Sequence, residues 1–242
     1  RTFNELLARL EGAFGQQRRF MTDAAHELRT PVAILRGEAD VALARDDRPA
    51  EEYRGSLRLV REESRRLSGV VDDLFLLARA DAGEHLLRPT DFYLNDLVEE
   101  CVRSARALAA ARRIDVEGET DGDAPFRGDE AHLHRLLVNL LDNAIKYSPP
   151  GTRVTVTMRR EDGRYRVSVR DAGIPVAPEL RERIFERFFR AGTTGGSHAS
   201  GAGLGLAIAR WAAEAHGGAL VLLPSGPGGG NEFILWLPVP AE

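Results

Sequence analysis

The chain has 242 residues, of which 43% are hydrophobic and 29% are charged, with a formal net charge of −4 at pH 7. This length and apolar content suffice for one or two domains with buried cores. The mildly acidic balance argues against nucleic acid as a partner, and no run approaches the roughly 18 apolar residues of a membrane span. Cys101 is the one cysteine, which excludes intrachain disulfides and cysteine-rich metal sites. Since no segment resembles a signal peptide, we expect an intracellular chain.

The first 35 residues have the spacing of a long helix. Apolar or small residues recur every three or four positions, which is typical of a seam that packs against other helices. Helical register is already present at Thr2, so we expect a fragment of a longer protein. The seam positions are Leu7, Leu10, Phe14, Met21, Ala24, Leu28, Pro31 and Leu35, with polar Gln17 among them.

A second helical run follows a polar connection that contains Pro49, a residue that suits the first turn of a helix. Its seam positions are Val60, Ser64, Leu67, Val71, Leu74 and Ala78. Two antiparallel helices with narrow seams bury little apolar surface, but two copies can complete a four-helix bundle. We therefore predict a homodimer through residues 1–81. The alternative is an intramolecular hairpin resting on the C-terminal domain.

The pattern changes after Asp81, where Gly83 is a plausible helix stop and residues 82–90 form a linker. Residues 91–242 predict an α+β domain, in which helices cover one mixed sheet. Asp162-Gly163 between two alternating segments signals a hairpin. The expected helices are 91–111, 132–146 and 204–216, and the expected strands are 114–116, 154–158, 165–170, 219–223 and 232–237.

The most informative motif is His-Glu-Leu-Arg-Thr-Pro at residues 26–31. His26 lies off the seam, on the predicted solvent side, and an imidazole is a good nucleophile near neutral pH. Glu27 can orient or deprotonate the ring, and Thr30 lies one turn further on the same face. Pro31 lacks the amide that would bond the carbonyl of Glu27, so we expect the helix to loosen or bend there.

This motif resembles the phosphoacceptor box of sensor histidine kinases. The resemblance implies that His26 is phosphorylated, that Glu27 polarises its ring, and that Thr30 positions water for dephosphorylating a response-regulator receiver domain. The start of the chain also resembles the signal-relay helix of membrane-bound histidine kinases, although an ordinary amphipathic helix is an equal alternative. The resemblance implies a cytoplasmic part of an inner-membrane sensor, which would meet the membrane only through upstream segments.

Asn139 and Asn143 are four residues apart and share a face of a predicted helix. An amide oxygen is a hard donor that suits Mg²⁺, although paired asparagines can also be capping or surface residues. With Lys146 and Tyr147 they resemble the first box of the Bergerat-type ATP-binding domain of histidine kinases. The resemblance implies that Asn143 binds the metal, that Asn139 supports it, and that Lys146 and Tyr147 approach the phosphates. Related ATPases have a water-activating glutamate at the position of Asn139, and an amide there favours transfer over hydrolysis.

Asp171-Ala-Gly173 at the end of a predicted strand resembles the adenine-reading box of the same domain. The resemblance implies that Asp171 binds the adenine 6-amino group and that Gly173 lets the backbone approach the ring. The family usually continues with glycine where this chain has Pro175. Proline cannot adopt a positive φ, so we expect nucleotide affinity or loop motion to be affected.

Two further segments complete the series. Residues 183–190 resemble the start of the mobile lid, which implies that Arg190 points toward the terminal phosphate. A glycine-rich segment before a periodic helix then offers free amides to an anion, although a plain linker is the alternative. It does not follow a strand, so it is not a Rossmann fingerprint. The nucleotide-binding residues implied here are Gly201, Gly203, Leu204 and Gly205.

Together the motifs predict a protein-histidine kinase that uses ATP and Mg²⁺. It would phosphorylate His26, pass the phosphoryl group to a response-regulator aspartate, and also act as a phosphatase of that regulator. Pro175 motivates an alternative, a catalytically weak nucleotide-binding dimeric signalling scaffold. A third hypothesis, an ATPase clamp, is disfavoured by Asn139 and His26.

Overall fold

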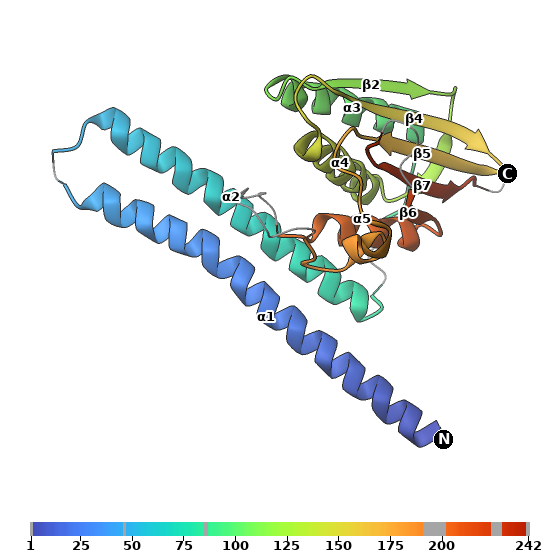
Figure 1. The fold of residues 1–242 in the computed structure, drawn as a ribbon, viewed down its shortest axis with the longest axis horizontal. Helices are drawn as coiled ribbons and strands as arrows, with labels where there is room; N and C mark the ends of the chain where they lie inside the picture. Colours follow the sequence, from blue (N-terminus) through green and yellow to red (C-terminus); the bar gives the residue numbers. More distant parts are fainter. Residues whose placement is uncertain (1, 46, 85–86, 191–201, 224–228, 241–242) are drawn as a thin grey trace. The chain divides into compact units, whose positions relative to one another are not determined.

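The computed structural model describes residues 2–45, 47–84, 87–190, 202–223 and 229–240. The chain forms two compact units, residues 1–83 and 84–242 (Figure 1). None of the described helices is long and apolar enough to cross a membrane.

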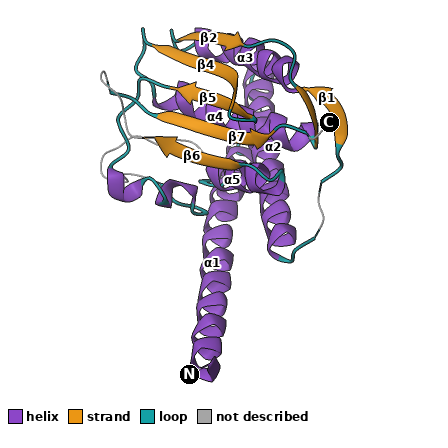
Figure 2. Ribbon diagram, turned by 90° about the vertical axis from the view of Figure 1, so that its right-hand side faces the viewer, coloured by secondary structure: helices purple, strands orange, loops and turns teal. Residues whose placement is uncertain are grey.

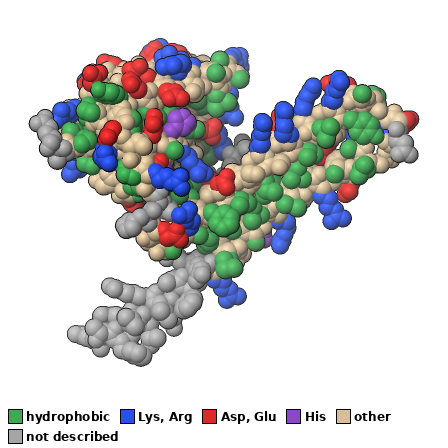
Figure 3. All heavy atoms as spheres, turned by 180° about the vertical axis from the view of Figure 1, so that it is seen from behind, with side chains coloured by type: hydrophobic (Ala, Val, Ile, Leu, Met, Phe, Trp, Pro, Cys, Tyr) green, Lys and Arg blue, Asp and Glu red, His purple; other side chains and the backbone are tan. Residues whose placement is uncertain are grey.

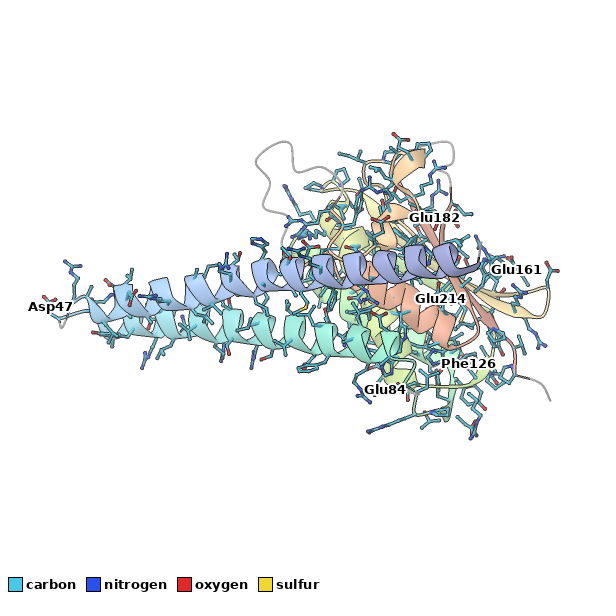
Figure 4. The ribbon with its side chains drawn as sticks, turned by 90° about the horizontal axis from the view of Figure 1, so that it is seen from below. Asp47, Glu84, Phe126, Glu161, Glu182 and Glu214 are labelled. Atoms are coloured by element: carbon cyan, nitrogen blue, oxygen red, sulfur yellow. The ribbon has the colours of Figure 1, made fainter. Side chains whose placement is uncertain are left out.

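The first unit is a hairpin of two helices that lie side by side (Figure 1). These helices are α1 (Thr2–Leu43) and α2 (Ala50–Asp81). Pro49 precedes α2 with a φ of −58°, which suits a helix start. The hydroxyl of Tyr53 donates to the carbonyl of Arg45 at 3.0 Å and closes the turn that carries Asp47 (Figure 4). After α2, Gly83 adopts a φ of +71°, in agreement with the predicted stop.

The predicted seam of α2 is partly buried in the single chain. The buried residues of α2 are Ser56, Val70 and Leu77. Of the predicted seam positions, four are half-buried and two are exposed: Val60, Leu67, Val71 and Leu74, and Ser64 and Ala78 respectively. Because the seam was predicted to be completed by a second copy, it stays a prediction. The α1 seam side chains Leu7, Leu10, Phe14 and Gln17 lie outside the described part of the chain.

The second unit is built on a mixed five-stranded sheet. In spatial order its strands are β2 (Asp115–Thr120), β4 (Arg153–Glu161), β5 (Arg164–Arg170), β7 (Glu232–Pro238) and β6 (Ala219–Leu223). β2 and β4 are parallel, and the other neighbours are antiparallel. The turn between β4 and β5 has positive φ at Asp162 (48°) and Gly163 (71°), as a type I′ turn requires. The predicted hairpin is confirmed.

Helices cover one face of this sheet and lie behind it in Figure 2. They are α3 (Leu94–Ala110), α4 (Glu130–Tyr147) and α5 (Gly205–Ala215), with short 3₁₀ turns η1 (Pro178–Leu180) and η2 (Arg183–Phe185). Their apolar sides join inward-facing strand residues, such as Val154 and Leu235, in one core. The predicted α+β class is therefore correct.

One predicted helix starts later than expected. Residues 91–93 belong to β1 (Thr90–Tyr93), which pairs with β3 (Pro125–Gly128) in a separate two-stranded sheet. The backbone N–H of Leu94, the first residue of α3, donates to the carbonyl of Ala124 at 2.8 Å. This pairing joins segments about 35 positions apart, so the local periodicity could not reveal it.

A buried histidine joins the C-terminal end of α5 to the N-terminal end of α4. Nε2 of His216 accepts a hydrogen bond from the backbone N–H of Asp129 at 2.9 Å, and Nδ1 lies 2.7 Å from the carbonyl of Ala212. Nδ1 therefore carries the proton and the ring is neutral. Asp129 caps α4 by accepting a bond from the backbone N–H of His132 at 3.0 Å. A Cβ at Gly128 would lie 2.7 Å from the His216 ring, so this approach requires glycine.

Burial lowers the pKa of His216 from its ordinary value of 6.5, and the hydrogen bond to Ala212 and the charge of Asp129 only partly oppose this effect. The unfolded chain therefore takes up a proton at a higher pH than the folded chain does. The stability that His216 contributes is fully present above pH 6.5 and is lost as the pH falls toward the folded-state pKa.

Replacing His216 removes the acceptor of a buried backbone N–H. We expect His216→Phe to lower the free energy of unfolding in urea by roughly 1–3 kcal/mol at about pH 7.5. The deficit should shrink near pH 5.5, because only the wild type loses the contribution of His216 in acid. His134→Ala serves as a control that keeps the wild-type pH dependence. An equal deficit at both pH values would contradict this assignment.

Candidate functional site

His26 is exposed in α1, and the neighbouring Glu27 is half-buried. The exposed Thr30 donates its hydroxyl to the carbonyl of His26 at 3.5 Å. No hydrogen bond or ion pair between the His26 ring and Glu27 is present in the described part of the chain. The helix continues through Pro31 without interruption, so the expected loosening does not end it. The ring nitrogens of His26 are therefore open to an external electrophile.

Helix α4 carries Asn139 and Asn143, whose side-chain amides are the predicted supporting and metal-binding groups. The Nδ2 atom of Asn139 donates to the carbonyl of Gly205 at 3.0 Å, which ties α4 to the first turn of α5. Asn143 lies one turn further and is half-buried, and within the described residues its side chain makes no hydrogen bond. The carbonyl oxygen of Asn143 is thus available as a hard ligand. No cluster of three His, Cys, Asp or Glu side chains offers a metal site among the described residues.

The end of α4 meets the segment that follows β5. A Cβ at Gly173 would lie 2.9 Å from both the carbonyl oxygen of Tyr147 and Oδ1 of Asp171, so this crossing requires glycine. Lys146 holds its ammonium 5.1 Å from the ring centroid of Tyr147, which is 53% exposed. The structure therefore places the end of the helix that carries Asn139 and Asn143 beside the predicted adenine-reading segment.

Asp171 is 5% exposed, and its two carboxylate oxygens are unequal. Oδ1 accepts three hydrogen bonds, from the backbone N–H of Gly173 (2.7 Å) and from the side-chain and backbone N–H groups of Asn231 (3.0 and 3.3 Å). Oδ2 accepts none from any residue that the structure describes. Burial raises the pKa of Asp171, and the bonds from Gly173 and Asn231 partly oppose the shift.

Asn231 was missed by sequence analysis. It precedes β7 after three glycines and therefore looks like an ordinary turn residue. Its neighbour Gly230 has a φ of +84°, and a Cβ there would lie 2.0 Å from the carbonyl oxygen of Asp171. Only glycine allows the two backbones to pass this closely, and that requirement is the one sequence signal that could have pointed here.

A backbone hydrogen bond joins the predicted start of the lid to the end of the glycine-rich segment. The backbone N–H of Phe188 donates to the carbonyl of Gly203 at 3.0 Å, and a Cβ at Gly203 would lie 2.9 Å from the Phe188 backbone. Phe188 itself has a φ of +60°, a costly conformation for an aromatic residue. Arg190 is exposed two residues further along the chain. Strain is therefore concentrated where the two segments join.

Leu204 is buried at the start of α5, and Gly205 begins the helix against Asn139. Gly201 lies outside the described residues. Arg210 of α5 forms ion pairs with Glu182 at 2.9 Å and Glu214 at 3.1 Å, and both glutamates are labelled in Figure 4. The described site thus gathers an α4 face, the Asp171 loop and the α5 N-terminus, which fit a hard cation, a purine and phosphates respectively.

Two family models match the chain. "His Kinase A (phospho-acceptor) domain" matches residues 16–83, and "Histidine kinase-, DNA gyrase B-, and HSP90-like ATPase" matches residues 128–241. The first match includes His26, and the second includes the amides of α4 and Asp171. The two motif groups recognised in the sequence therefore lie in two separately recognised modules.

Named relatives agree with these matches. The chain is 38% identical over 237 residues to the sensor-like histidine kinase SenX3 of Mycobacterium tuberculosis, covering 97% of this chain and 56% of SenX3. It spans about half the length of the curated relatives it matches. The solved complex of histidine kinase ThkA with response regulator TrrA is 25% identical with a TM-score of 0.68, and the match covers 96% of this chain and 66% of that one.

A second solved structure is matched over almost its whole length. The mycobacterial sensor histidine kinase MprB is 31% identical with a TM-score of 0.55, and the match covers 62% of this chain and 97% of that one. With its phosphoacceptor motif on an exposed helix face and its amides and Asp171 in an ATPase-type fold, the chain belongs to the sensor histidine kinase family.

Proposed function

We propose that the chain is an ATP-dependent protein-histidine kinase that phosphorylates His26 and passes the phosphoryl group to a response-regulator aspartate. The observation that carries this proposal is an exposed histidine, in a phosphoacceptor motif, on the same chain as the Asp171 and Asn143 site. Neither half alone would distinguish a kinase from a binding module.

The adenine 6-amino group would donate to Oδ2 of Asp171, the carboxylate oxygen that no described residue occupies. Gly173 leaves room for the ring beside this carboxylate. The phosphates would then lie toward the N-terminus of α5 at Gly203 and Gly205, where free N–H groups attract anions. Lys146, Tyr147 and Arg190 are the side chains proposed to approach them.

The residues of α4 fit a magnesium ion. Asn143 would be its protein ligand, since its amide oxygen has no described partner and Mg²⁺ keeps most of its other ligands as waters and phosphates. When bound, the ion neutralises phosphate charge as the phosphoryl group moves. Asn139 would act as a support, because one side of its amide is already bonded to α5.

The transfer step needs a nucleophile and no hydrolytic base. A ring nitrogen of His26 uses its lone pair to form the N–P bond with the γ-phosphorus, and the bond to the β–γ bridging oxygen breaks to release ADP. Glu27 would hold the proton on the other ring nitrogen. A carboxylate in place of Asn139 would lie against the carbonyl oxygen of Gly205, which is a repulsive contact. The amide at position 139 also cannot take a proton from an attacking water, which supports transfer to histidine rather than hydrolysis.

Homodimerisation through residues 1–81 is part of the proposal. Large apolar side chains remain exposed on the hairpin, which is the elongated part of the molecule in Figure 3. They include Met21 (65%), Val41 (55%), Leu57 (66%) and Phe75 (65%). A second copy that completes a four-helix bundle would cover such residues.

The proposed partner is a response-regulator receiver domain, which the ThkA–TrrA complex supports by similarity. Thr30 is proposed to position water for dephosphorylating that partner. We also propose that the chain is the cytoplasmic part of a longer sensor, since the curated relatives named as sensors are about twice its length. The competing proposal is a catalytically weak signalling scaffold, which the departure at Pro175 favours.

Incubation with γ-labelled ATP and magnesium separates these proposals. We expect acid-labile, alkali-stable label on the protein, and His26→Ala should reduce it by about 10³-fold or more. His134→Ala controls for loss of a histidine and should keep the label. Free phosphate without protein label would indicate an ATPase clamp, and neither product would indicate the scaffold.

Thr30 can be tested apart from autophosphorylation. Thr30→Ala should leave labelling of His26 intact but slow phosphate loss from the phosphorylated regulator by about tenfold or more, since it removes a water-positioning hydroxyl. Thr22→Ala is a matched control, because Thr22 makes the same bond to the helix, to the carbonyl of Arg18 at 3.0 Å. Unchanged phosphate loss in Thr30→Ala would refute the phosphatase assignment.

A further inference from the structure

All the polar groups of the Asn231 side chain form hydrogen bonds with the segment that contains Asp171. It is 7% exposed and lies directly before β7. Its Nδ2 donates both to Oδ1 of Asp171 at 3.0 Å and to the carbonyl of Ile174 at 3.1 Å, and its Oδ1 accepts from the backbone N–H of Val176 at 2.8 Å. Both amide N–H groups and the carbonyl oxygen are therefore engaged.

The backbone of Asn231 strengthens this link. The N–H of Asp171 donates to the carbonyl of Asn231 at 2.9 Å, and the N–H of Asn231 donates to Oδ1 of Asp171 at 3.3 Å. The glycine at 230 permits the close passage of the two segments. Asn231 and Asp171 are thus held together by three hydrogen bonds, two donated by Asn231 and one donated by Asp171.

These bonds decide which oxygen of Asp171 can meet a ligand. Oδ1 already has three donors, more than its two lone pairs serve well. The carboxylate cannot rotate to exchange its oxygens without breaking them, so Oδ2 alone remains as an acceptor. An adenine amine offers a donor to such an atom, whereas the O6 atom of guanine would offer a second acceptor and be repelled.

The side chain of Asn231 also forms hydrogen bonds with the backbone on both sides of Pro175. Proline has no N–H, so the loop cannot bond through that residue. The side chain of Asn231 instead donates to the carbonyl of Ile174, before the proline, and accepts from the backbone N–H of Val176, after the proline. Ile174 is 87% exposed, so contacts of its own side chain do not hold this loop. The amide of Asn231 therefore fixes it at both sides of the proline, together with Val176, which packs partly buried against the core.

We propose that Asn231 is a positioning residue that sets base selectivity, by fixing both the Asp171 carboxylate and the Pro175 loop for adenine over guanine. This inference rests on the proposed function, because it takes Asp171 to be the residue that meets the base. No sequence motif assigned a role to Asn231, and its effect is exerted through Asp171 rather than by contact with the nucleotide.

The test compares Asn231→Ala and Asn231→Asp with wild type, using the 242-residue chain. Direct binding of ATP and GTP is measured by calorimetry with magnesium, and KM and kcat come from autophosphorylation. We expect the preference for ATP over GTP to fall by about 10–100-fold, with the loss mainly in affinity and KM. Both variants lose the two donors of the amide, but Asn231→Asp should bind ATP more weakly than Asn231→Ala, because it also puts a second carboxylate beside Asp171.

Asn95→Ala is the matched control. Asn95 is also buried (9% exposed), belongs to the same unit, and accepts from a backbone N–H, that of Ala124, at 3.0 Å. It should lower thermal stability without changing the ATP-to-GTP ratio. If an Asn231 variant does not fold, Asn231→Ser replaces it, since a hydroxyl restores one donor in little space.

The outcomes are separable. If the folded Asn231 variants keep the wild-type preference for ATP over GTP, the inference is overturned and the kinase proposal stays intact. A wild-type chain that binds neither nucleotide would instead overturn the proposed function on which the inference rests. If the preference for ATP over GTP falls equally in Asn95→Ala, the effect of Asn231 is one of general stability, and the inference is overturned.

Discussion

Helix α4 must bury one side against the sheet, and this constraint places the groups of the nucleotide site. Its core face is made of leucines and small residues, and the buried members are Leu133, Leu136, Leu137, Leu140, Leu141, Ala144 and Ile145. With that face fixed, Asn139 and Asn143 share the side that remains accessible. Asn139 then reaches the start of α5, and the last turn reaches the Asp171 loop. A slip of one residue in α4 would separate all three segments.

Around this helix, hydrogen bonds and glycines hold loops that carry few apolar contacts. Gly173, Gly203 and Gly230 each occupy a place where a Cβ would collide with backbone or a carboxylate. The positive φ of Phe188 adds strain at the base of the predicted lid. Such positions cost folding stability, so their concentration beside Asp171 and Asn139 is consistent with a site organised for binding rather than for stability alone.

Much of the fold could be predicted because its signals are local. The periodicity of α4, the Asp162-Gly163 turn and the alternating strands each depend on neighbouring residues. The pairing of β1 with β3 and the role of Asn231 depend instead on residues distant in the chain. For the site, the motifs identified residue types, but the unequal oxygens of Asp171 and the bond from Asn139 to Gly205 required coordinates.

In the proposed reaction, a phosphoryl group leaves ATP for one imidazole. The most direct measurement is mass spectrometry of peptides from ATP-treated protein, kept alkaline to preserve phosphoramidates, with sites mapped across the chain. We expect one phosphoryl group, on the His26 ring and on no other histidine. Phosphate on a different residue, or an unmodified His26 in protein that demonstrably binds ATP, would contradict it.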